Sequence, residues 1–155
     1  MENSEFWYPL PKLAQKNLVG TSPTICIIDD NDDNLFLYEW IFTRYLPDYA
    51  LSLFSDGLFV QQYLNSAKSK PDLILLDLKM PHISGFDLLT ELRQNDRWQH
   101  IPVVVFTNST SLKDKEECYK AGASGFIQKA FSVNTIKAQL EEICQQWLSH
   151  KRFRL

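Results

Sequence analysis

The chain has 155 residues, of which 45% are hydrophobic and 23% are charged, as is typical of one globular domain with a sizeable core. Its formal net charge of -3 excludes a general attraction to nucleic acid, and its one dense basic cluster lies at residues 150–154. Three widely spaced cysteines without a C-x-x-C pair indicate free thiols in a reducing compartment. No apolar run is long enough to span a membrane. We therefore expect a cytoplasmic protein without direct contacts to nucleic acid or membranes.

Residues 1–22 are predicted to form an N-terminal extension or arm. The segment contains the run FWYPLP at residues 6–11 and ends in a linker-like GTSP at residues 20–23. The three adjacent aromatic residues allow two interpretations, a loosely ordered tail or an arm packed on its own domain or on a second subunit. Residues 150–155 are predicted to form a basic, solvated tail. Residues 23–149 remain for the folded domain.

From residue 24 onward, apolar runs alternate with segments of helical periodicity. The predicted strands cover residues 24–28, 50–54, 72–77, 101–107 and 124–129. The predicted helices cover residues 34–46, 57–67, 84–95, 111–122 and 132–148. Three of the strands lack polar alternation, as expected of interior strands in a parallel sheet covered on both faces. The pattern predicts an α/β fold of the flavodoxin-like, doubly wound type, with a five-stranded parallel sheet in the order 2-1-3-4-5 and helices on both faces.

Polar residues follow the predicted strands at the edge where such folds bind ligands. Asp29 and Asp30 end the first strand and Asp77 ends the third, which is its neighbour in the predicted order. Three converging carboxylates need a cation, and Mg²⁺ suits them because few protein ligands are offered and positions remain for water and phosphate. Thr107 and Lys129 end the fourth and fifth strands. Together these residues predict a phosphoryl-transfer site in which a carboxylate is the nucleophile.

The chain resembles the receiver domains of response regulators in two-component signalling, over residues 24–147. The resemblance rests on Asp29-Asp30, on DLKMPHISG at residues 77–85, on IPVVVFTNS with Thr107, and on AGASGFIQKAFS with Lys129. It implies a stand-alone response regulator that is not a turnover enzyme. Asp77 would accept a phosphoryl group from the phosphohistidine of a sensor histidine kinase or a histidine phosphotransfer protein, and would lose it slowly.

The resemblance also implies a metal site. Mg²⁺ would be bound by Asp30, by Asp77 and by the backbone carbonyl of Lys79. Asp29 would bind it directly or through water.

A switch is implied as well. Lys129 would pair with the phosphoryl oxygens, and Thr107 would hydrogen-bond one of them. Phe126 corresponds to the switch aromatic residue, which moves inward when Thr107 is drawn toward the phosphate. The readout would be a population shift in the surface made by residues 111–122, 124–129 and 132–148. Because too few residues follow for a second domain, output would run through a protein partner or a homodimer.

The sequence departs from the family pattern after Lys129, where Ala130 replaces the usual proline of a cis bond. A cis bond costs about 0.5–1 kcal/mol before proline but about 2.5–4 kcal/mol before other residues. We nevertheless expect a cis Lys129–Ala130 bond, because the lysine must still reach the phosphate. The alternative is a trans bond with a different approach of the lysine.

The acidic run that begins at Asp29 has other interpretations. A calcium-binding EF-hand loop is excluded because its sixth position is Asn34 rather than glycine and its twelfth is Trp40 rather than glutamate. Asp32 and Asp33 are expected to cap the first helix and to suit its dipole. For the whole chain, the remaining alternative is a receiver-like interaction module that is not phosphorylated.

Overall fold

A parallel sheet of five strands forms the centre of the protein. The structure, a computed structural model, describes residues 22–66 and 70–152. The strands are β1 (Thr24–Ile28), β2 (Ala50–Phe54), β3 (Leu73–Leu76), β4 (Val103–Thr107) and β5 (Gly125–Gln128). They pair in parallel in the order β2-β1-β3-β4-β5. The flavodoxin-like order predicted from the sequence is therefore confirmed.

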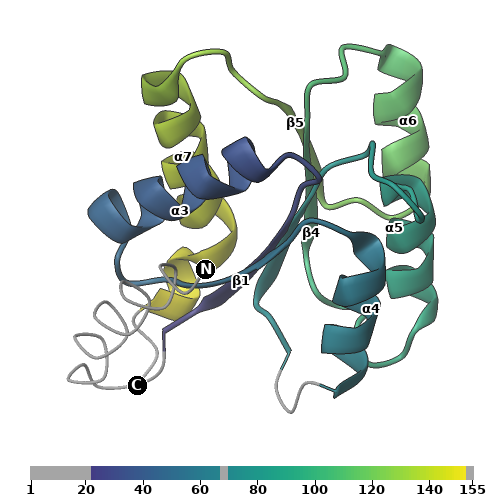
Figure 1. Cartoon of the computed structure of the whole chain (residues 1–155). Coiled ribbons are helices and arrows are strands. Elements are labelled where there is room, and N and C mark those ends of the chain that lie inside the picture. The colour runs from purple at the N-terminus through teal and green to yellow at the C-terminus, as the bar shows by residue number, and fades with distance from the viewer. Residues whose placement is uncertain (1–21, 67–69, 153–155) are drawn as a thin grey trace.

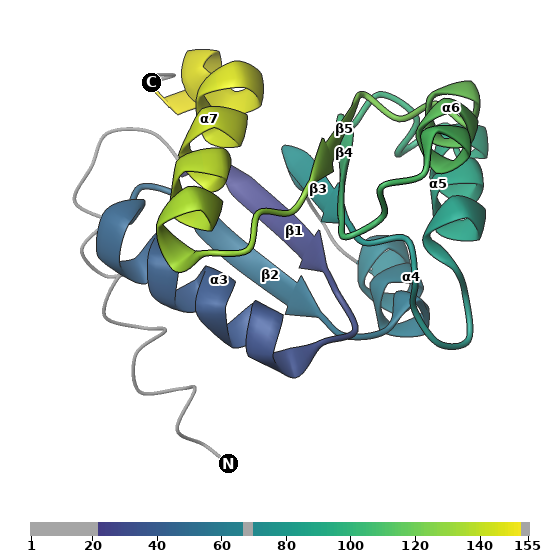
Figure 2. The ribbon, with the colours of Figure 1, turned by 90° about the horizontal axis from the view of Figure 1, so that it is seen from above.

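Helices cover both faces of this sheet (Figure 1, Figure 2). On one face lie α3 (Asp32–Tyr45) and α7 (Val133–Arg152), and on the other lie α4 (Gly57–Ser66), α5 (Gly85–Gln94) and α6 (Leu112–Lys120). Successive side chains of a strand point to opposite faces. Ile25 and Ile27 of β1 accordingly pack in the core under α3 and α7, whereas Cys26 and Ile28 pack in the core under α4 and α5. None of the helices in the described parts of the chain has the length and apolarity needed to cross a bilayer.

Among the helix boundaries that differ from the prediction, the start of α3 and the end of α7 have clear local causes. α3 begins at Asp32, two residues early, and its N-cap is Asn31, whose side chain accepts from the N–H groups of Asp33 and Asn34. The two aspartates lie in the first turn, where their charges suit the helix dipole, but the cap is the preceding asparagine, because only that residue has the extended conformation that caps require. α7 continues to Arg152 rather than ending at residue 148, since no glycine or proline interrupts it.

The Lys129–Ala130 bond is trans, so the cis bond predicted from the family pattern is wrong. Without a proline ring, the cis form costs about 2.5–4 kcal/mol, and the trans chain is held by good hydrogen bonds. The N–H of Lys129 donates to the carbonyl of Thr107 at 2.8 Å, and the N–H of Ala130 donates to Oε1 of Gln139 at 3.0 Å.

The predicted terminal segments lie mostly outside the described residues. Of the N-terminal arm only Ser22 is described, and residues 153–155 of the basic tail are outside as well.

Candidate functional site

Three aspartates gather at the carboxyl end of the sheet. Asp29 and Asp30 follow β1, and Asp77 follows the neighbouring strand β3. Their backbones are fixed to the sheet, because the N–H of Asp29 donates to Phe54 and the N–H of Asp77 donates to Ile28, each at 3.0 Å. One carboxylate oxygen from each of the three lies within 4.8 Å of the others. Asp29 is 1% exposed and Asp77 is 9% exposed, whereas Asp30 faces solvent, so the cluster opens on the Asp30 side.

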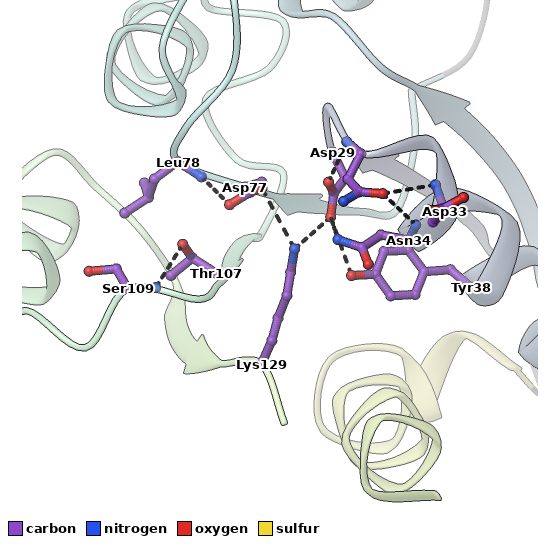
Figure 3. A network of polar contacts seen from close by, with 10 residues as sticks. Asp29, Asp33, Asn34, Tyr38, Asp77, Leu78, Thr107, Ser109 and Lys129 are labelled. Atoms are coloured by element: carbon purple, nitrogen blue, oxygen red, sulfur yellow. Dashed lines mark hydrogen bonds and ion pairs between the residues drawn. The ribbon is translucent and has the colours of Figure 1, made fainter. Parts of the chain in front are cut away.

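The carboxylate of Asp29 is held by four hydrogen-bond donors (Figure 3). Its Oδ2 accepts from Nζ of Lys129 at 2.6 Å, from Nδ2 of Asn34 at 3.2 Å and from the hydroxyl of Tyr38 at 3.3 Å. Its Oδ1 accepts from the backbone N–H of Asn31 at 2.9 Å. Charge-assisted hydrogen bonds of this kind fix the orientation of a buried carboxylate. Oδ1, which has a single protein donor, is therefore the oxygen better placed to face a further ligand.

Sequence reasoning missed two of these donors. It did not place Tyr38 or Asn34 in the site. The available signal was their spacing, since they follow Asp29 by five and nine residues. Residues four apart share one side of a helix, and that side faces the end of β1.

Lys129 lies between two of the aspartates (Figure 3). Its Nζ is 2.6 Å from Oδ2 of Asp29 and 3.6 Å from Oδ2 of Asp77, so the shorter ion pair is with Asp29. The ammonium group is buried, and the rings of Tyr38 and Phe106 have their centroids 6.0 and 5.9 Å from it. One ammonium group does not balance three carboxylates, so the site keeps a net negative charge that a further cation would neutralise.

Asp77 is less fully compensated than Asp29. Burial raises the pKa of the Asp77 carboxyl above its usual range, and Lys129 opposes this effect without cancelling it. The charge of Asp29 raises the pKa of Asp77 further, whereas hydrogen bonds from Leu78 and Thr107 lower it. Oδ1 of Asp77 accepts from the N–H of Leu78 at 2.8 Å, which orients the group. Perturbed carboxyls of this kind cluster at functional sites.

The other predicted residues lie at different depths around Asp77. Thr107 is buried at the end of β4, and its hydroxyl accepts from the N–H of Ser109 at 3.3 Å. Phe126 is half-buried on β5, opposite Val105 of β4, in a small apolar cluster. The side chain of Lys79 is exposed. The structure thus brings Asp29, Asp30, Asp77, Thr107 and Lys129 together and leaves the side chains of Lys79 and Phe126 outside this group.

The loop after Asp77 is folded tightly against the strand end. A Cβ atom on Gly85 would lie 2.4 Å from the carbonyl oxygen of Asp77, so only glycine allows this approach of α5. His82 has a positive φ of 68°. Its Nδ1 is 2.6 Å from Oδ2 of Asp56, which ties this loop to the one after β2.

The aspartate cluster fits a hard divalent cation. Mg²⁺ and Ca²⁺ prefer oxygen ligands, and Mg²⁺ keeps several of its waters. The three carboxylate oxygens within 4.8 Å supply the ligand type, and the exposed side at Asp30 admits water.

Comparisons with known proteins agree with this geometry. Residues 25–141 match the family model of the response regulator receiver domain. The chain is 30% identical over 132 residues to the probable methanogenesis regulatory protein FilR2 of Methanothrix harundinacea, which covers 83% of this chain and 85% of FilR2. Three other relatives are longer, and the chain spans 16%, 25% and 43% of them.

Two solved structures are similar over most of the chain. The phosphorylated cyanobacterial phytochrome response regulator RcpA is 26% identical with a TM-score of 0.78, and the match covers 84% of this chain and 96% of RcpA. The receiver domain of a sensor histidine kinase from Pseudomonas aeruginosa, with a magnesium ion coordinated in its active site cleft, is 25% identical with a TM-score of 0.68. That match covers 83% of this chain and 99% of that receiver domain. The family model matches residues 25–141, and the sheet has the strand order β2-β1-β3-β4-β5. The chain therefore belongs to the response regulator receiver domain family.

Proposed function

We propose that Asp77 accepts a phosphoryl group from a phosphohistidine and that this transfer switches a protein-interaction surface. The observation that carries the proposal is the placement of the Asp77 carboxylate. It lies beside the two other aspartates, with Nζ of Lys129 at 3.6 Å. An attacking oxygen and a cation that can pair with the oxygens of the transferred group thus share one edge of the sheet. The phosphorylated state of the relative RcpA supports the same interpretation.

The reaction is a displacement at phosphorus. A carboxylate oxygen of Asp77 attacks the phosphorus atom, the P–N bond to the donor imidazole breaks, and the leaving nitrogen takes up a proton from solvent. Lys129 and Thr107 supply the ammonium group and the hydroxyl closest to this carboxylate, and each would pair with a phosphoryl oxygen. Lys129 would have to exchange part of its ion pair with Asp29 for this contact. Since the acceptor itself is modified, the protein would act as a phosphoacceptor and not as a turnover enzyme.

Mg²⁺ is the proposed cofactor. Asp30, Asp77 and the backbone carbonyl of Lys79 would hold it, with Asp29 binding directly or through water. The ion would neutralise negative charge on the phosphoryl oxygens. The saturation of Oδ2 of Asp29 by three donors favours a role for Oδ1. The magnesium ion in the cleft of the Pseudomonas aeruginosa receiver domain supports this assignment.

The proposed readout is a change in the surface formed by α6, β5 and α7. Thr107 lies opposite Gln128 in the β4–β5 pairing, and Phe126 lies two residues before Gln128 on the same strand. A shift of Thr107 toward a phosphoryl group on Asp77 would therefore change the space open to Phe126. The surface that these three elements form would then bind a partner or a second copy differently.

A protein donor suits the surroundings of the site. Large apolar side chains are exposed near the N-terminal ends of α4, α6 and α7, at the same edge of the sheet as Asp77. They are Leu58, Phe59, Leu112, Phe131 and Val133. Exposed apolar groups around a site indicate contact with a macromolecule. The proposed donor is a sensor histidine kinase or a histidine phosphotransfer protein.

Phosphoramidate with magnesium chloride tests the proposal without knowledge of the natural donor. We expect intact-mass measurement to show one phosphoryl adduct on the wild type, none on Asp77→Asn, and a normal adduct on Asp87→Asn. Asp87 is a matched control because it is an exposed aspartate in the first turn of α5. If the wild type takes up no phosphoryl group, the alternative of an unphosphorylated interaction module replaces the proposal. If Asp77→Asn takes up as much as the wild type, another residue is the acceptor and the assignment to Asp77 is wrong.

A further inference from the structure

One side of α3 exposes aromatic side chains that no described part of the chain covers. Phe36 is 66% exposed and Trp40 is 42% exposed, one helical turn apart. With Thr43 and Arg44 they line a hollow of about 460 Å³, which we name the α3 groove. Exposed apolar surface of this kind marks an interaction site.

We propose that the α3 groove binds the chain's own N-terminal segment, residues 1–21, through Phe6, Trp7 and Tyr8. The segment supplies three adjacent aromatic residues. Aromatic pairs gain about 0.5–1.5 kcal/mol beyond the burial of their area, so an aromatic run suits an aromatic groove.

The N-terminal segment joins the folded domain close to the groove. The carbonyl of Pro23 accepts from the N–H of Ala50 at 2.9 Å, and Ala50 opens β2 shortly after α3 has ended. The chain therefore enters β1 at the end of the sheet where α3 finishes (Figure 2). Trp40 lies roughly 8 Å from the end of α3, at 1.5 Å per residue. The residues between Tyr8 and Ser22 can span roughly 45 Å, so reach is not limiting.

Charge favours the same pairing. The guanidinium of Arg44 lies 5.7 Å from the centroid of the Trp40 ring, and Nζ of Lys137 lies 4.7 Å from the centroid of the Tyr45 ring. The N-terminal segment carries Glu2 and Glu5 before its aromatic run and Lys12 and Lys16 after it. Arg44 in the lining of the groove thus gives the acidic residues before Phe6 an oppositely charged partner.

An exposed patch at the start of α4 fits less well. Leu58 and Phe59 lie at the start of α4, two and three residues after the carboxylate of Asp56. This patch lies on the opposite face of the sheet from α3 (Figure 1).

A nitroxide spin label at position 4 of the full-length protein tests the proposal. The three native cysteines are buried, so the label attaches selectively to Ser4→Cys. We expect the amide NMR signals of Phe36 to Tyr45 to lose intensity strongly, and the signals of α4 and α6 to keep theirs. Broadening centred on any other element, or no broadening within the folded domain, would overturn the proposal.

Two controls identify the groove and the occupant. Phe36→Ala should restore the α3 signals, whereas Phe59→Ala, which changes an aromatic residue that is 57% exposed on α4, should leave the broadening unchanged. Both side chains are exposed, so neither variant should impair folding. A mixture of isotope-labelled protein without nitroxide and nitroxide-labelled protein without isotope should show no broadening. If the broadening appears in that mixture, the occupant is the segment of a second copy and the intramolecular proposal is wrong.

Discussion

The carboxylate of Asp77 is buried, and the nearby positive charge does not fully balance its negative charge. This imbalance affects the stability of the folded protein. A carboxyl whose pKa is raised in the folded state binds protons more tightly there, so the free energy of unfolding rises as the pH falls through that raised pKa. At neutral pH the ionised group is therefore destabilising when no metal is bound. We expect Asp77→Asn to raise the free energy of unfolding by on the order of 1 kcal/mol, which corresponds to about 2–4 °C in Tm.

Thermal unfolding in a chelator, followed by circular dichroism, measures this gain. It should be largest at neutral pH and should shrink as the pH falls toward about 4, the ordinary range of an aspartic acid. A gain that does not change with pH would mean that the asparagine stabilises for another reason. A loss of stability would mean that Lys129 depends on Asp77 more than on Asp29.

The hydroxyl of Tyr38 is the least expected part of the site. Burial and the charge of Asp29 raise the pKa of Tyr38, so the phenol remains a proton donor at physiological pH. We expect Tyr38→Phe to lower the free energy of unfolding by about 1 kcal/mol, because the ring contact with Phe106 at 5.9 Å is retained and only one hydrogen bond is lost.

Urea unfolding of Tyr38→Phe beside Tyr63→Phe measures this loss. The ring of Tyr63 packs on Phe54 at 5.1 Å, away from the aspartates, so this control should change stability little. Equal losses in the two variants would show that the hydroxyl of Tyr38 contributes nothing specific to Asp29.

At the scale of single residues, the sequence predicted the aspartates, Thr107 and Lys129, because each stands at the end of an apolar run. Parallel strands finish at one edge, so their last residues meet there. The contact of Tyr38 could not be predicted in the same way. Apolar spacing shows which side of a helix is buried, but the direction of one hydroxyl depends on how α3 is rotated above β1.

At the scale of the elements, the start of α3 shows which residue of an acidic run caps the helix. The side chain of Asn31 accepts from two free N–H groups, whereas Asp32 and Asp33 act through their charge in the first turn. We expect Asn31→Ala to lower the free energy of unfolding by about 1 kcal/mol. Asp32→Ala should cost less, about 0.3–1 kcal/mol at low salt, and its effect should fade as salt is added.

Urea unfolding at low and high salt separates the two contributions. The cost of Asn31→Ala should be nearly independent of salt, because a hydrogen bond is screened less than an exposed charge. A larger cost for Asp32→Ala than for Asn31→Ala would restore the capping by aspartate that the sequence predicted.

The exact ends of helices and the conformations of loops were predicted least well, because both depend on local alternatives that the sequence leaves open. The start of α3 shifted by two residues because Asn31, Asp32 and Asp33 are all acceptable near a cap. The Lys129–Ala130 bond was expected to be cis so that the lysine could reach its target. The long, flexible lysine side chain makes that reach possible from a trans bond.

For the whole molecule, the strand order followed from few facts. Alternating strands and helices with right-handed crossovers leave few possible strand orders. The acidic residues after the first and third strands can form one site only if these two strands are neighbours. The position of residues 1–21 had no comparable constraint, because no periodic pattern relates the aromatic run to an element of the sheet. For this reason its contact is proposed from exposed surface and charge.

A cation bound by the aspartates should stabilise the fold as a whole. The ligands come from the ends of β1 and β3, which are neighbours in the sheet but far apart along the chain. An ion that binds only the folded state adds RT ln(1 + [Mg²⁺]/Kd) to the free energy of unfolding. At one hundred times Kd this is about 2.7 kcal/mol, or ~5–10 °C in Tm.

Asp30→Asn should remove most of the rise because it deletes an exposed ligand without disturbing the core, whereas Asp87→Asn should keep it. Differential scanning calorimetry with magnesium chloride, compared with sodium chloride of equal ionic strength, measures the effect. An equal rise in sodium chloride, or in Asp30→Asn, would assign the stabilisation to screening of the acidic cluster and would remove the metal from the site.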